Sequence, residues 1–80
     1  MKIKKDIAVS DSGFLFNPVT GESFSVNNIG AAIIGYLKQG LSPKEIPAAL
    51  VKDFEVTETM AERDVQDFMN MLMHFQLMEP

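Results

Sequence analysis

The chain has 80 residues, of which 46% are hydrophobic, and a formal net charge of −4. This length predicts one domain, residues 1–80, and the negative charge disfavours DNA binding, which needs clustered lysine and arginine. With no cysteine and one histidine, the sequence offers neither a disulfide nor a zinc ligand set. No segment has the ~20 apolar residues of a membrane span, and no signal peptide is visible. We expect a soluble cytoplasmic domain without metal or membrane contacts.

The first third of the chain has the pattern of a small antiparallel sheet. Alternating apolar residues favour a first strand within residues 4–10, a second over 14–17 and a third over 22–26. Residues 17–21 form a turn signal in which Gly21 can adopt a positive φ. Because only helical patterns follow, we expect the third strand to keep an open edge. Such an edge can accept an extended peptide as an additional strand.

Two helices are expected next. Asn27 or Asn28 can cap the start of the first helix, and Gly40 suits the position just after its end. Ser42 and the residues that follow it carry several start signals for the second helix. Pro47 removes a backbone donor, so we expect a bend or a late start there.

A third helix is expected to begin after Thr57 and has the clearest helical periodicity in the chain. Its apolar positions, at spacings of four, three, four and three, are Ala61, Val65, Phe68, Leu72 and Phe75. Four methionines widen this apolar surface beyond one stripe. Core packing alone, or core packing with a peptide groove or dimer face, would explain them. The order of three strands and then three helices predicts an α+β fold.

Catalytic and cofactor signals are absent from the sequence. His74 is the only conventional general base, and no serine stands in a nucleophile-elbow motif. The glycines match neither a phosphate loop nor a dinucleotide fingerprint. We therefore expect no enzyme activity and no cofactor.

Two segments carry a resemblance to a known family: GFLFNPVTGESFSVN at residues 13–27, followed by Gly30 and Ala31, and AERDVQDF at residues 61–68. They resemble the PqqD-like family, also called the RiPP recognition element, and the similarity extends over residues 7–78. The resemblance implies a winged helix-turn-helix-like fold with a three-stranded antiparallel sheet and three helices. It also implies binding of the leader segment of a ribosomally made precursor peptide, which adds beside the third strand and against the third helix. The domain would present this peptide to a separate modifying enzyme, which is a radical SAM enzyme in the pathway to pyrroloquinoline quinone.

Ten residues are candidate contacts for such a peptide. The third strand would supply Ser23, Phe24, Ser25 and Val26. The third helix would supply a groove floor of Val65, Phe68, Met69 and Leu72, and a charged rim of Arg63 and Asp67. For each floor residue, ordinary core packing explains the apolar side chain equally well.

Two alternative functions remain open at this point. A winged-helix fold could bind DNA, although the basic residues form no run and the third helix is acidic. The chain could also be an assembly subunit, a homodimer that pairs through the open strand edge and the methionine-rich surface.

Overall fold

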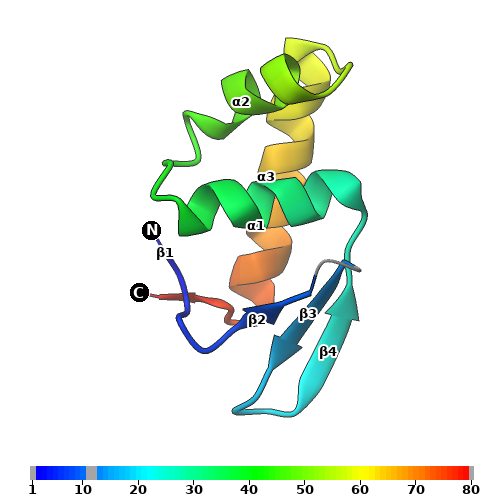
Figure 1. Ribbon diagram of the computed structural model, residues 1–80. Coiled ribbons are helices and arrows are strands. Elements are labelled where there is room, and N and C mark those ends of the chain that lie inside the picture. Colours follow the sequence, from blue (N-terminus) through cyan, green and yellow to red (C-terminus); the bar gives the residue numbers. More distant parts are fainter. Residues whose placement is uncertain (1, 11–12, 80) are drawn as a thin grey trace.

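The computed structural model describes residues 2–10 and 13–79 and places three helices beside two small sheets (Figure 1). The strands of the described residues are β1 (Lys2–Ile3), β2 (Ala8–Val9), β3 (Phe14–Asn17), β4 (Glu22–Ser25) and β5 (Met78–Glu79). The helices are α1 (Asn28–Lys38), α2 (Ile46–Asp53) and α3 (Glu58–His74). Strands β2, β3 and β4 form an antiparallel sheet in that order. The predicted α+β fold, a three-stranded sheet followed by three helices, is confirmed.

The β3–β4 hairpin follows its sequence pattern closely. Residues 18–21 connect the two strands, and Gly21 has a φ of +77°, as the turn prediction requires. Leu15 points into the core and is fully buried, whereas Phe14 and Phe16 lie on the outer face of the sheet and are largely exposed. This alternation gives the sheet one covered face and one open face.

The N-terminal region differs from its prediction. Only Ala8 and Val9 of residues 4–10 pair with β3, because the chain turns just before them, where the Ile7 N–H donates to the Lys4 carbonyl. The residues before this turn form β1, which pairs antiparallel with β5 at the other end of the chain. This two-stranded ribbon was not predicted from the sequence.

Local caps define the helix starts as expected. Asn27 caps α1, since its Oδ1 accepts the Gly30 N–H at 2.8 Å, and Thr57 caps α3 by accepting the Met60 N–H. Gly40, with a φ of +95°, follows the end of α1 in the left-handed conformation that glycine favours.

The late start of α2 is also confirmed. The helix begins at Ile46, so Pro47 occupies its first turn, where a missing N–H breaks no intrahelical bond. The earlier start signals form a separate turn instead. In that turn the Glu45 carboxylate accepts the Ser42 N–H, and this bond lowers the pKa of Glu45.

The core lies between α3, the other two helices and the inner face of the sheet. Its buried apolar residues are Ile3, Ile7, Leu15, Ile33, Ile34, Leu37, Ile46, Leu50, Ala61, Val65, Met69, Leu72, Leu77 and Met78. Members of this set come from all three helices and from both ends of the chain. Within the described residues, no helix is long and apolar enough to cross a membrane.

Candidate functional site

Strand β4 is the outermost strand of its sheet (Figure 1), and nothing in the described part of the chain pairs with its outer edge. The Val26 N–H donates to the Gly13 carbonyl at 2.7 Å, so the Val26 amide faces β3. Backbone groups of successive strand residues point to opposite sides. Those of Phe24 therefore also face β3, while those of Ser23 and Ser25 face the open edge. This edge offers two N–H donors and two carbonyl acceptors.

An apolar strip lies beside the inner face of β4, and we define it as Phe24, Val26, Phe68 and Phe75. The Phe24 and Phe75 rings pack with their centroids 4.7 Å apart. Val26 and Phe68 both approach Gly30 of α1: a Cβ on this glycine would lie 3.1 Å from the Val26 Cβ and 2.8 Å from the Phe68 Cε1. Glycine thus allows α1, β4 and α3 to approach one another here.

A cavity of about 240 Å³ adjoins the strip between the start of α1 and α3. Phe68 and Met71 of α3 line it, together with Ile29 of α1. Two carboxylates, Asp64 and Asp67, also line it. The predicted rim residue Asp67 therefore stands at a cavity next to β4. The other predicted rim residue, Arg63, is exposed on α3 and does not line this cavity.

The four predicted floor residues lie in three different places. Phe68 belongs to the apolar strip. Val65 and Met69 are buried and line a cavity of about 440 Å³ on the α2 side of α3, with Pro43 and Pro47. Leu72 is fully buried in the core. Peptide contact by these residues stays a prediction, and Phe68 is the one of the four that belongs to the apolar strip.

Sequence reasoning left three residues out of the candidate site that the structure places at it. They are Phe75, Met71 and Asp64. The sequence marks Phe75 as an apolar helix position and Met71 as one of the four methionines of the third helix, and it does not single out Asp64 within that acidic helix. The periodicity of α3 identifies such positions but does not indicate which of them stand beside an edge strand. The hairpin pattern predicts the edge strand, but only the three-dimensional packing shows which α3 residues lie beside it.

The chemistry available at this site is binding through backbone hydrogen bonds and apolar contact. The described residues contain no group of His, Cys, Asp and Glu that could hold a metal ion. His74 is exposed and packs edge-on against Phe75, with 5.0 Å between ring centroids. Its place agrees with a surface packing role.

Comparisons with known proteins point in one direction. The family model of coenzyme PQQ synthesis protein D (PqqD) matches residues 13–77. A search of curated proteins found no match. Among solved structures, "TbiB1 in Complex with the TbiA(beta) Leader Peptide" shares 32% identity, with a TM-score of 0.85 over 99% of this chain and 95% of that chain. "Lasso peptide synthetase B1 complexed with the leader peptide" shares 29% identity, with a TM-score of 0.82 over 99% and 96% of the two chains. This chain belongs to the PqqD family.

Proposed function

We propose that this domain is a non-catalytic module that captures the leader segment of a ribosomally synthesised precursor peptide. The leader adds as a strand at the open edge of β4, and the domain presents it to a separate modifying enzyme. The observation that carries this proposal is the open edge next to the apolar strip. The two similar structures were both solved with a leader peptide, which supports the same class of ligand here.

Backbone pairing alone does not provide enough affinity. The four groups of Ser23 and Ser25 can form four hydrogen bonds at ~0.5–1.5 kcal/mol each, or roughly 2–6 kcal/mol in total. Micromolar binding requires about 8 kcal/mol. Side-chain contacts must supply the remainder.

The apolar strip is positioned to supply these contacts. Alternate side chains of an added strand point to the same side as Phe24 and Val26, so they would meet Phe68 of α3 and Phe75 just after its end. We assign the floor of the site to this strip and its charged rim to Asp67, with Arg63 farther out on α3. Val65, Met69 and Leu72 would then support the site from the core.

The solved relatives support one of the candidate pathways more than the other. Both similar structures are described in terms of leader peptides, one of them for lasso peptide synthesis, which supports a lasso-type precursor over the quinone cofactor pathway. The modifying enzyme would be a partner in the same compartment, the cytoplasm, where a cysteine-free domain loses nothing to a reducing environment. The genes beside this one distinguish the pathways: a radical SAM gene would favour the cofactor branch.

Replacing Ser25 tests the strand addition directly. Because its N–H faces the open edge, Ser25→Pro removes a donor for the leader without removing a bond to β3. We expect the leader peptide encoded beside this gene to bind Ser25→Pro about tenfold or more weakly, a loss of about 1.4 kcal/mol. Ser25→Ala keeps the N–H and is the matched control, with affinity within about twofold of the wild type. Titration calorimetry gives both dissociation constants.

Amide chemical shifts locate the bound peptide. The leader should move the NMR signals of residues 23–26 and of the α3 residues near Phe68. Equal affinity of Ser25→Pro and the wild type would contradict strand addition, as would shifts scattered over other surfaces. Sedimentation of the free protein addresses the homodimer alternative: a stable dimer that Ser25→Pro dissociates and the leader does not would favour an assembly subunit.

A further inference from the structure

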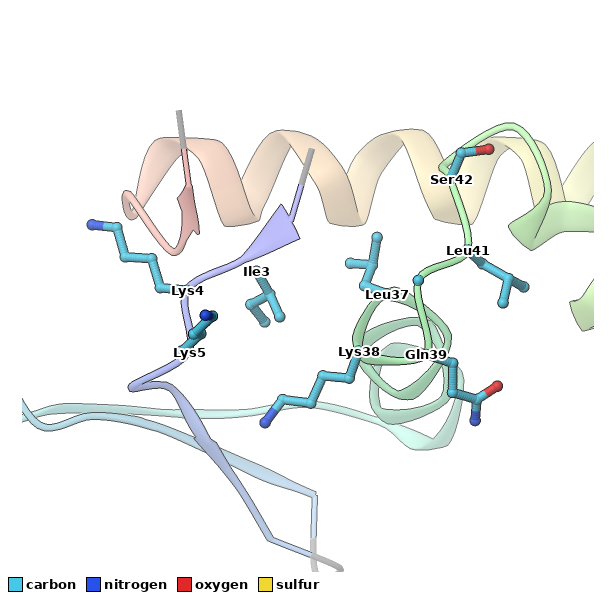
Figure 2. Close-up of a pocket in the computed structure, with 9 residues that line it drawn as sticks. Ile3, Lys4, Lys5, Leu37, Lys38, Gln39, Leu41 and Ser42 are labelled. Atoms are coloured by element: carbon cyan, nitrogen blue, oxygen red, sulfur yellow. The ribbon is translucent and has the colours of Figure 1, made fainter.

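A second cleft lies at the end of α1 that is remote from β4. It encloses about 580 Å³ between the N-terminal segment and the last turn of α1 (Figure 2). The buried side chains of Ile3 and Leu37 line it, and the partly buried Leu41 lines its far end. Apolar side chains thus form one part of its wall.

Lysine side chains supply the charge of this cleft. Figure 2 shows Lys4 and Lys5 on the N-terminal segment and Lys38 extending from α1 toward that segment. The Lys38 Nζ donates to the Ile7 carbonyl at 3.1 Å, which ties this side chain to the N-terminal segment. We call the site the lysine cleft.

The lysine cleft has the opposite charge from the rest of the domain. Three of the seven basic residues line it, although the chain has a net charge of −4. None of its lining residues is acidic. Glu45 does not line it, and Asp6 lines a neighbouring cavity that shares Lys4 with this one. The site therefore presents positive charge around an apolar wall.

We propose that the lysine cleft docks an acidic segment of a partner protein, in which apolar side chains alternate with carboxylates. Apolar side chains of the segment would pack mainly on Leu41, with Ile3 and Leu37 behind it. Its carboxylates would meet the ammonium groups of Lys5 and Lys38, while Lys4 adds positive charge on the outer side of the N-terminal segment (Figure 2). Complementary charges of this kind set the choice of partner and the association rate. An inorganic anion would leave the apolar wall without a contact. Three lysines on an acidic domain are too few for a nucleic acid backbone.

The position of the cleft separates its partner from the leader peptide. Helix α1 has 11 residues, so at 1.5 Å per residue its two ends lie roughly 16 Å apart. The start of α1 follows β4, and its end lines the lysine cleft. A protein seated in the cleft leaves the edge of β4 free. The proposal therefore goes beyond leader binding and does not depend on it.

Two synthetic peptides test the chemistry of the cleft. The first is a short acetylated peptide of glutamate pairs separated by leucines, and the second has lysine in place of every glutamate. We expect the acidic peptide to move the amide signals of residues 3–5 and 37–42, and to leave those of β4 unchanged. Its affinity should fall roughly fivefold or more between low and high salt, because the charges lie at the surface.

A charge-reversal pair with a matched control tests the residues. Lys4→Glu with Lys5→Glu should weaken binding of the acidic peptide about tenfold, whereas Lys44→Glu with Lys52→Glu changes the net charge equally and should weaken it less than about twofold. Melting curves confirm that each variant is folded. Lys4→Gln with Lys5→Gln serves as the second variant if the reversal destabilises the domain.

Several results would overturn this proposal. They are equal binding of the lysine peptide, equal weakening by both variant pairs, shifts that map to β4 or α3, and displacement of the acidic peptide by saturating leader. The leader's own dissociation constant should be the same in the Lys4/Lys5 variant and the wild type. The two peptides therefore test the two proposals separately: the acidic peptide tests the cleft, and the leader tests the edge of β4.

Discussion

The two long sides of α3 carry similar apolar residues but differ in what covers them. On one side, Val65 and Met69 are 4% and 5% exposed, because they face the α2 region and its prolines. On the other side, Phe68 is half-buried and Phe75 is 38% exposed. On the side of α3 that the rest of the chain covers, the apolar side chains contribute to stability. The side next to an edge strand keeps part of them available for a ligand.

The incomplete cover has a structural origin. Strand β4 is four residues long and contributes one apolar side chain, Phe24, to the inner face, with Val26 just after it. Gly30 brings α1 close to Phe68 but adds no side chain there. In the proposed site, a strand added at the edge of β4 would cover this side of α3.

Truncating a side chain on the covered side of α3 should have the largest effect on stability. We expect Met69→Ala to lower the free energy of unfolding by about 2–5 kcal/mol, because it leaves a cavity in the core. Urea denaturation measures this loss. The dissociation constant for the leader, corrected for the folded fraction, should stay within about twofold of the wild-type value. A large change in leader affinity would show that the two sides of α3 are not separate in function.

Truncating a side chain on the side of α3 beside β4 should have the reverse effects: a large loss of leader affinity and a smaller loss of stability. We expect Phe68→Ala to weaken leader binding about tenfold, or about 1.4 kcal/mol, because the ring belongs to the apolar strip. Its stability cost should be smaller than that of a fully buried phenylalanine, since part of the ring is already exposed. Calorimetry and urea denaturation on the same sample give the two values. Unchanged leader affinity would remove Phe68 from the site.

The smallest effect concerns an exposed link between α1 and α2, away from β4. Tyr36 donates a hydrogen bond to Asp53; partial burial, this bond and the Asp53 charge raise the pKa of Tyr36 to about 12. An unfolded tyrosine has a pKa of about 10. The folded state therefore retains the phenol proton at higher pH, and stability falls as the pH rises from about 10 to 12.

The chain has one tyrosine, so its phenolate absorbance can be followed without overlap. We expect Asp53→Asn to shift the midpoint of this titration toward 10 and to leave leader binding at neutral pH unchanged. An identical midpoint in the variant would mean that Asp53 does not control the phenol.

Local signals made much of the fold predictable. The hairpin turn, the caps at Asn27 and Thr57 and the late start at Pro47 each depend on residues close in sequence, and the structure contains them all. The open edge of β4 was predictable because the residues after the hairpin have helical patterns. The family resemblance indicated the same edge.

Non-local packing explains what the sequence did not reveal. Strands β1 and β5 have two residues each, too few for a periodic pattern, and their pairing joins opposite ends of the chain. The same limit applies to α3: spacing of three and four marks Phe68 and Met69 alike as apolar. Which of the two residues is covered depends on where α2 packs against α3.

The β1–β5 ribbon has a consequence for engineering. Lys2 and Glu79 are direct partners across the ribbon, so sequences added before the first or after the second would emerge side by side. The domain could then be inserted into a loop of a host protein with little distortion of the host. The host would then be joined to the domain at two neighbouring points, and the open edge of β4 would face outward.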